Sequence, residues 1–375
     1  MTTNEHIDTI VIGGGQSGLS MGYHLAKRGV PFVILDANER VGHAWRSRWD
    51  SLRLFTPAWY TGLDGMRFNG KGRVAPTKDE MADYLEAYAA RFDLPIRKGV
   101  KVDSVSRQDG VFVVQAGDQR FEADQVVIAT GAAQNPWTPP FADQLDPRIV
   151  QMHSYDYRNV SQLQDGGVLL VGAGNSGADI GMDVVREHPT WVAGRHPGHI
   201  PPRIDKRPGC YTVHVVRFLG HHVLTLRNPI GRKVIPKMMK GGDPLIRIKP
   251  KDMLAAGIER VPRVEGVRDG LPLLEDGRVL DVANVIWCTG FHHSFSWIDL
   301  PIVGDDGRPK HERGVATSEP GLYFLGLEYQ FAASSDVITG VGRDAAYLAK
   351  RIARQEKSVP RRDTDARTAV SLRGS

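Results

Sequence analysis

The chain has 375 residues, 41% hydrophobic and 24% charged, with a formal net charge of +5 at pH 7. This mixture excludes wholesale disorder, and the length predicts two or three domains. The two cysteines, Cys210 and Cys288, exclude a disulfide scaffold and a CxxC redox centre. No apolar run reaches the roughly 18 residues of a membrane span, and no secretory signal is seen. We therefore expect a cytoplasmic protein with no membrane partner.

The first predicted element is an apolar strand at Ile7–Ile12 that leads into the glycine turn GGGQSG. A helix predicted over 19–27 follows, and then a second strand at 32–35 that ends in Asp36. This order is typical of a dinucleotide-binding unit, because the glycines admit a tight turn and a close pyrophosphate while the acid bonds ribose hydroxyls. The first dinucleotide is expected on Gly13, Gly15, Ser17, Gly18 and Asp36.

Further along, apolar spacing predicts a helix over Thr77–Phe92. Its aromatic and aliphatic face is interpreted as core, not as a ligand site; the face consists of Met81, Tyr84, Leu85 and Tyr88. A β-rich stretch follows at 101–105, 111–115 and 121–123, and the apolar residues 127–129 then lead into Thr130 and Gly131.

The same pattern recurs 159 residues later. A strand at Val168–Val171 leads into the turn GAGNSG, and Thr289-Gly290 repeats Thr130-Gly131 at the same offset. Landmarks that share one offset indicate two related dinucleotide-binding units. The second dinucleotide is expected on Gly172, Gly174, Asn175, Ser176, Gly177 and Arg195.

The two units differ at the end of the second strand, where Asp36 corresponds to Arg195. An acid repels a 2′-phosphate, whereas a guanidinium binds it through two hydrogen bonds. The second site is therefore predicted to take NADPH, with NADH left open as a second donor. The alternative is that Arg195 only caps a strand end.

From Arg195 to Lys251 the chain carries 13 Lys and Arg against two acids. Three interpretations stand: a nucleic-acid surface, a solvated face, or a site for the phosphates of a small ligand. The last is favoured and nucleic acid is not expected, because neither aromatic interleaving nor a nucleic-acid motif is present. Residues 211–251 either line the substrate entrance or form a helical insertion. The adjacent pairs His221-His222 and His292-His293 lack metal-ligand spacing, so no metal is expected.

Four kinds of motif together suggest a family. They are the two glycine turns, the segment Gly42-His43-Ala44-Trp45-Arg46 beyond Asp36, the segment Cys288-Thr289-Gly290-Phe291, and the late GLYFLG strand at 321–326. On these residues the chain resembles the flavin-containing monooxygenases, class B flavoprotein monooxygenases, and most closely their smaller bacterial members. The resemblance extends to about residue 354.

This resemblance implies an α/β fold with two Rossmann-like domains, arranged as in the glutathione-reductase-like two-domain flavoproteins. The FAD-binding domain is expected at 1–160 and 282–375, the NADPH-binding domain at 161–281, and a flexible tail at 355–375. Trp45 and Arg46 would lie along FAD, Val102 would meet the adenine, and Thr130-Gly131 and Thr289-Gly290 would mark the crossings between domains.

Two departures from the family pattern stand out. His153 and Tyr157 of a family fingerprint are present, but Pro147 and Ile149 occupy the places of its Phe and Gly. Phe55 stands where larger members place an Asn near the flavin edge, so it is a candidate residue for the substrate or the flavin edge.

The function implied is an FAD- and NADPH-dependent monooxygenase. Its C4a-(hydro)peroxyflavin would oxygenate a small organic sulfide, amine or ketone with O2, and no catalytic side chain is assigned. Dimers are common among such enzymes, so a homodimer is one expectation. Two alternatives remain: a flavin reductase that passes electrons to a carrier, and a nucleotide-sensing regulator.

Overall fold

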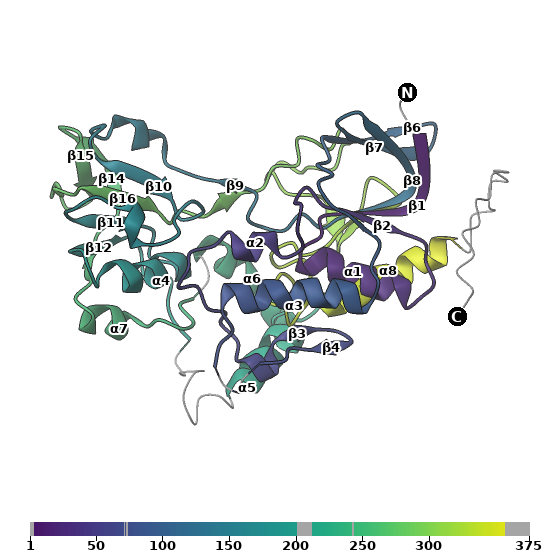
Figure 1. Ribbon diagram of the computed structural model, residues 1–375, viewed down its shortest axis with the longest axis horizontal. Helices are drawn as coiled ribbons and strands as arrows, with labels where there is room; N and C mark the ends of the chain where they lie inside the picture. Colours follow the sequence, from purple (N-terminus) through teal and green to yellow (C-terminus); the bar gives the residue numbers. More distant parts are fainter. Residues whose placement is uncertain (1–3, 71, 73, 201–211, 242–243, 357–375) are drawn as a thin grey trace.

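Two sheets, one in each half of the molecule, organise the chain (Figure 1). This computed structural model describes residues 4–70, 72, 74–200, 212–241 and 244–356. The first sheet runs in the order β18-β19-β20-β8-β1-β2-β5, and β7 pairs with both β8 and β6. Its strands are β1 (Asn4–Ile12), β2 (Val33–Leu35), β5 (Ile96–Arg97), β6 (Ser104–Gln108), β7 (Val111–Ala116), β8 (Gln119–Ile128), β18 (His311–Glu312), β19 (Val315–Ala316) and β20 (Leu322–Phe324).

The central strand β1 is buried on both faces, as expected of a parallel sheet with covered faces. Val11 faces a core built with helices α1 (Gln16–Ala26), α3 (Lys78–Arg91) and α8 (Val341–Glu356). Its neighbours Ile10 and Ile12 face a second core, shared with β7 and β8. Alternate residues thus serve opposite faces, which fixes the register of β1 against β2 and β8.

Helix α3 confirms the helix predicted over Thr77–Phe92. Thr77 accepts a hydrogen bond from the Glu80 N–H and Glu80 accepts one from the Thr77 N–H, which closes a capping box. The apolar face is buried as predicted: Met81, Tyr84, Leu85 and Tyr88.

The second sheet is wholly parallel and runs in the order β10-β16-β11-β12-β13. Helices α4 and α7 lie on one side of it, and the hairpin β14–β15 lies on the other with the 3-10 turn η2. Its elements are β10 (Val150–His153), β11 (Val168–Val171), α4 (Asn175–Val184), β12 (Thr190–Ala193), α7 (Pro250–Ala255), β13 (Glu259–Val261), β14 (Val264–Arg268), β15 (Leu271–Leu274), β16 (Asn284–Trp287) and η2 (Pro140–Gln144).

The two halves repeat one another at the offset predicted from the sequence. β1 and β11 end at Ile12 and Val171, and β8 and β16 end at Ile128 and Trp287. Helices α1 and α4 begin at Gln16 and Asn175. Each pair is separated by 159 residues, so two units of one design confirm the expected α/β fold.

The chain passes between the halves through two short strands, β9 (Asn135–Pro136) and β17 (Phe291–His292), which pair with each other (Figure 1). These crossings differ from the expected boundaries at 160/161 and 281/282. β10 and β16 belong to the second sheet because they pair with each other and β16 also pairs with β11. Boundaries near 135 and 290 therefore describe the sheets better.

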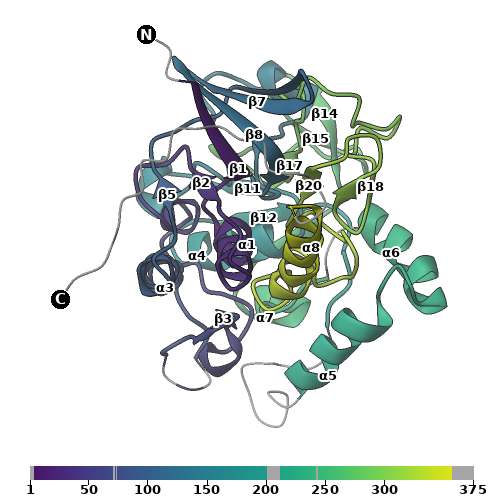
Figure 2. The same ribbon diagram turned by 90° about the vertical axis from the view of Figure 1, so that its right-hand side faces the viewer.

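Residues 212–241 form a helical insertion, one of the two forms expected for this stretch. It consists of α5 (Thr212–Phe218), a π-helical turn over Leu219–Val223, and α6 (Pro229–Gly241), which contains Pro236. The insertion extends away from both sheets (Figure 2). Its apolar side chains include exposed Val215, Phe218, Leu226 and Ile230.

Between β2 and α3 the chain forms four short elements. They are α2 (His43–Arg46), a 3-10 turn at Ala58–Tyr60, and the strands β3 (Gly62–Leu63) and β4 (Met66–Arg67). Another 3-10 turn spans Val160–Gln162. The closing helix α8 continues to Glu356, beyond the start of the tail expected at 355, and residues 357–375 lie outside the described residues. None of the described helices has the length and apolar composition needed to cross a bilayer.

Candidate dinucleotide sites

The first glycine turn has the geometry of a phosphate cradle. Gly13 has φ of +108°, and a Cβ on Gly18 would lie 1.8 Å from the Gly13 carbonyl oxygen, so neither position admits a side chain. A Cβ on Gly15 would meet open space. Gly15 also begins α1 without any side-chain cap, which leaves the helix N-terminus open toward an anion. The residues present therefore fit a dinucleotide pyrophosphate.

Asp36 is held in place at the end of β2, where it is 7% exposed. Its Oδ2 accepts the Gly14 N–H at 2.9 Å, and its Oδ1 accepts both the backbone and side-chain N–H groups of Asn38 at 2.8 Å. This fixes the carboxylate beside the turn, where a ribose hydroxyl would lie. Asn38 was not anticipated, because nothing in its spacing marks it.

The remaining residues expected at the first dinucleotide differ in how far their side chains or backbone are already engaged by the protein. Trp45 packs against the helical core, whereas the Arg46 guanidinium pairs with Asp83 at 2.8 Å and Glu86 at 3.1 Å on α3. Ser17 is buried and lies against Gly326, in the loop after β20. The backbone of Val102 makes no hydrogen bond to any described residue, which suits an adenine contact.

Phe55, the candidate at the flavin edge, is 39% exposed. It follows Leu54, whose N–H donates to the Pro76 carbonyl at 2.8 Å. The ring is therefore available to a ligand from a segment fixed on either side by the protein.

The second glycine turn repeats the first. Gly172 has φ of +123°, and a Cβ on Gly177 would lie 2.0 Å from the Gly172 carbonyl oxygen. A Cβ on Gly174, at the start of α4, would meet open space. Cys288 packs behind this turn, and burial raises the pKa of its thiol to about 12, as suits an inert core residue.

The Asn175 side chain is occupied by the protein. Its Nδ2 donates to the Pro244 carbonyl at 3.1 Å, and its Oδ1 accepts the Ile246 N–H at 3.0 Å. Nearby, Arg247 pairs with buried Asp179 of α4 at 2.6 Å. The end of the basic segment is thus fixed on the second unit, beside the N-terminus of α4.

Basic side chains gather beyond the end of β12. Arg195 is exposed and makes no hydrogen bond or ion pair within the described residues. Arg260, on the neighbouring strand β13, donates to the Gly194 carbonyl at 2.9 Å. Burial, Arg260 and His199 together lower the pKa of His196. Arg260 could not be predicted from its place in the chain, because only the sheet order brings β13 beside β12.

The two Thr-Gly segments lie at the crossings, as expected from the sequence. Gln134 ties the first segment to the chain that follows the second: its Nε2 donates to Thr130 Oγ1 at 2.8 Å and to the Gly131 carbonyl at 2.9 Å, while its Oε1 accepts the Ser294 N–H at 3.1 Å. The Gly290 carbonyl accepts the Trp137 N–H at 3.1 Å. The crossing strands are therefore tied to each other by both backbone and side-chain bonds.

The two fingerprint residues present in the sequence lie near this crossing. His153 Nε2 is 3.0 Å from the Gly290 carbonyl oxygen, and burial lowers its pKa. The Tyr157 hydroxyl donates to Asp183 at 3.1 Å, and burial raises its pKa.

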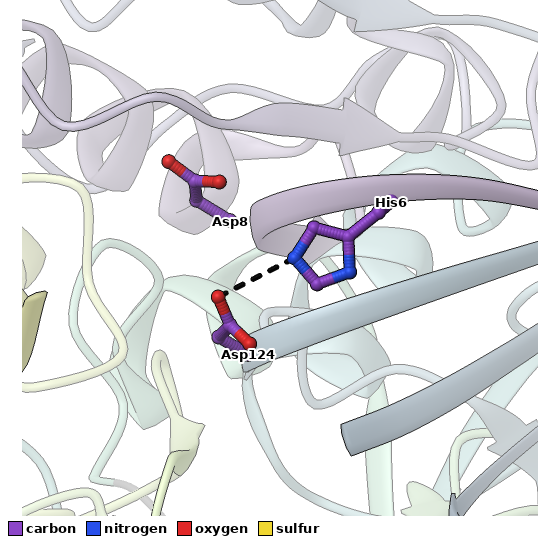
Figure 3. A group of neighbouring side chains, drawn as sticks. All are labelled: His6, Asp8 and Asp124. Atoms are coloured by element: carbon purple, nitrogen blue, oxygen red, sulfur yellow. Dashed lines mark ion pairs between the residues drawn. The ribbon is translucent and has the colours of Figure 1, made fainter. Parts of the chain in front are cut away.

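A separate group of metal-type ligands lies at the start of β1, at the opposite end of that strand from the glycine turn. His6 Nε2 is 3.4 Å from Asp124 Oδ2, and a carboxylate oxygen of Asp8 lies within 4.8 Å of a ligand atom of each (Figure 3). His6 and Asp124 are exposed, and the group takes no part in the dinucleotide sites.

Twin phosphate cradles, one beside an acid and one beside arginines, define a two-dinucleotide oxidoreductase. A family model described as pyridine nucleotide-disulphide oxidoreductase matches residues 10–196. An uncharacterized CzcO-like oxidoreductase of Geobacillus kaustophilus is 41% identical, covering 91% of this chain and 97% of that protein.

More distant relatives carry monooxygenase names. A probable indole-3-pyruvate monooxygenase of Arabidopsis thaliana, YUCCA3, is 29% identical over 93% of this chain and 88% of its own length. The structure of a flavin-containing monooxygenase from Stenotrophomonas maltophilia matches with a TM-score of 0.75 and 28% identity, covering 94% of this chain and 99% of that one. The chain belongs to the flavin monooxygenase family, among its CzcO-like oxidoreductases, and is a flavin-dependent enzyme. The cofactors predicted from the sequence are FAD and NADPH, and a structure that shares the fold, 15% identical with a TM-score of 0.68, is the OTEMO complex with FAD and NADP.

Proposed function

We propose that the first unit binds FAD, that the second binds NADPH, and that the protein transfers one oxygen atom from O2 to a small organic substrate. The observation that carries the assignment is the contrast between two equivalent turns. The first turn meets the buried carboxylate of Asp36, whereas the second lies against Gly194, which precedes Arg195 and accepts a hydrogen bond from Arg260. Because a carboxylate repels a 2′-phosphate and a guanidinium binds one, the phosphorylated dinucleotide belongs in the second unit.

In this proposal, the protein's own groups bind the two dinucleotides and orient them toward each other. The open N-termini of α1 and α4 would each accept a pyrophosphate, and Asp36 would bond the ribose of FAD. The strands β9 and β17 hold the two units in a fixed relation, so that one dinucleotide can face the other.

When bound, FAD supplies the redox chemistry: it takes a hydride from NADPH and, once reduced, activates O2. In the balanced reaction, NADPH, a proton, O2 and substrate give NADP+, water and the oxygenated substrate. Monooxygenase names among the relatives support oxygen transfer, and a sulfide, amine or ketone is the substrate class that we propose.

The test is a labelling experiment on the purified yellow protein. NADPH, ¹⁸O2 and a panel containing a thioether, a tertiary amine and a cyclic ketone are supplied, and products are analysed by mass spectrometry. One ¹⁸O atom in a product, with one NADPH consumed per product, is expected. Consumption of NADPH that gives only hydrogen peroxide or a reduced carrier, for every member of the panel, would instead identify a flavin reductase.

A further inference from the structure

Arg48 lies between the two units, and its guanidinium has no acceptor among the residues that the structure describes. Arg48 follows α2 in a segment that leaves the first unit and packs on the second. The neighbouring Trp49 is 5% exposed and shares a core cluster with Ala173 and Ala178 of the second glycine turn and its helix. The Asp50 N–H donates to the Arg158 carbonyl at 2.8 Å. Arg48 is therefore anchored close to the second dinucleotide site by the residues that follow it.

The surroundings of the Arg48 guanidinium are aromatic. Its central carbon lies 5.3 Å from the ring centroid of Tyr155 and 5.5 Å from that of Phe291. The side chain is half-buried, and it makes no hydrogen bond or ion pair with any residue that the structure describes. Burial lowers its pKa most, Tyr155 opposes this shift, and the charge of Arg158 adds to it.

A guanidinium carries five N–H donors, and burying them unpaired is costly unless a partner is supplied. The nearest acid along the chain does not supply one, because Asp50 accepts from Asn159 Nδ2 at 2.7 Å and lies 3.5 Å from Lys78. Other half-buried arginines of this protein do have carboxylate partners: Arg46 with Asp83, Arg107 with Glu319, and Arg247 with Asp179.

We propose that Arg48 binds an oxyanion of a ligand held between the two units, with the rings of Tyr155 and Phe291 setting the plane of the guanidinium. Stacked and unpaired, the planar group is prepared to donate two parallel hydrogen bonds to a phosphate or a carboxylate. This inference rests on the proposed function, because it takes the space between the units as the place where ligands meet. The oxyanion belongs either to the phosphates of the nicotinamide dinucleotide or to an organic acid substrate.

The test compares Arg48→Gln with Arg53→Gln. Arg53 lies five residues further in the same segment, is exposed, and donates to the Ala75 carbonyl. Replacing it by Gln changes the net charge of the protein by the same amount as Arg48→Gln, so it serves as the matched control. Both variants are purified with FAD, and the flavin spectrum and the melting temperature establish folding. Dissociation constants are then measured by flavin difference spectra for NADP+, for (phenylthio)acetate and for its neutral counterpart thioanisole.

If the oxyanion is a nucleotide phosphate, Arg48→Gln weakens NADP+ binding roughly ten- to a hundredfold, the range expected for a charge-assisted pair. If it is a substrate carboxylate, NADP+ binding is unchanged and (phenylthio)acetate loses a similar factor while thioanisole does not. For Arg53→Gln, the dissociation constants for NADP+ and (phenylthio)acetate are expected to stay within about twofold of the parent values, because the loss of an exposed charge has a small effect.

Unchanged binding of NADP+ and (phenylthio)acetate in folded, FAD-loaded Arg48→Gln would overturn the proposal and leave the guanidinium a packing element. Should that variant fail to fold, Arg48→Met keeps much of the length of the side chain without its charge, and undiminished binding there has the same meaning. These measurements need no turnover. Failure of oxygen transfer therefore tests the proposed function separately.

Discussion

In the assignment that we propose, single residues decide which dinucleotide each unit accepts. Asp36 and Arg195 stand at equivalent places, 159 residues apart, but they differ in burial as well as in charge. Asp36 is buried and receives three hydrogen bonds, whereas Arg195 is exposed and free of described partners. The carboxylate held beside the first turn repels a 2′-phosphate, whereas the exposed guanidinium of Arg195 can form hydrogen bonds with one.

Replacing Arg195 by Ala is expected to reduce the preference for NADPH over NADH. A hydrogen bond to a charged group contributes about 1.5–3 kcal/mol, which corresponds to a roughly ten- to hundredfold loss in kcat/KM for NADPH. The reaction with NADH should hardly change, because NADH has no 2′-phosphate. Steady-state kinetics with both donors measure the ratio, and Arg195→Lys, which keeps the charge, serves as the control. An unchanged ratio would show that Arg195 only ends a strand.

At the scale of elements, helix α3 shows how local sequence sets a boundary. Thr77 and Glu80 satisfy each other's backbone N–H groups at its start. Thr77→Ala removes one of these bonds and is expected to lower the free energy of unfolding by about 1 kcal/mol. Urea unfolding followed by circular dichroism measures the change, and Thr77→Ser, which keeps the hydroxyl, should restore most of it. A loss as large in the Ser variant would point to the methyl group instead of the cap.

The helical insertion docks on α8 through His221. Its Nδ1 lies 2.5 Å from Ser334 Oγ, and Arg343 of α8 donates to its carbonyl at 2.8 Å. Burial comes first among the causes that lower its pKa to about 4; Arg343, Arg217 and His222 add to it, and Asp344 opposes it.

This contact should make stability sensitive to pH. Above about pH 6.5 the imidazole is neutral in both states and contributes no pH dependence. Between pH 6.5 and about 4 the unfolded chain binds a proton that the folded protein does not, so the free energy of unfolding falls as the pH falls, by at most about 3 kcal/mol.

Urea unfolding at pH 7.5 and pH 5 measures this effect in the parent protein and in His221→Gln. The variant should lose less stability on acidification than the parent. His222→Gln, a change at the exposed neighbouring histidine, should lose as much as the parent. Equal losses in all three proteins would exclude His221 as the group responsible.

At the scale of the whole molecule, the duplicated design could be read from the sequence because glycine turns, strand ends and an acid or a base recur at one spacing. The order of strands could not. β10 and Arg260 join the second sheet through pairings between segments far apart in the chain, and nothing local announces them. Arg46 was expected at a dinucleotide, but its partners lie on α3, some 40 residues away. Motifs thus predict what a turn binds, and tertiary packing decides which side chains remain free to bind it.

The crossings decide whether the two units act together, and Gln134 contacts both of them. Gln134→Ala removes its bonds to Thr130, Gly131 and Ser294 at once. Each unit keeps its own site, so the dissociation constants for FAD and NADP+ should change little. The rate of flavin reduction by NADPH should fall roughly five- to tenfold, because neutral hydrogen bonds contribute about 1 kcal/mol each and fix the relation between the two dinucleotides.

Anaerobic stopped-flow measurements of flavin reduction provide the readout, with Gln134→Glu as the matched variant. A carboxylate can still accept the Ser294 N–H but cannot donate to Thr130, so an intermediate rate is expected. A parental reduction rate in folded Gln134→Ala would mean that the backbone pairing of β9 with β17 fixes the two units without help from this side chain. A slower rate accompanied by weaker NADP+ binding would place the effect in the second unit, and not at the crossing.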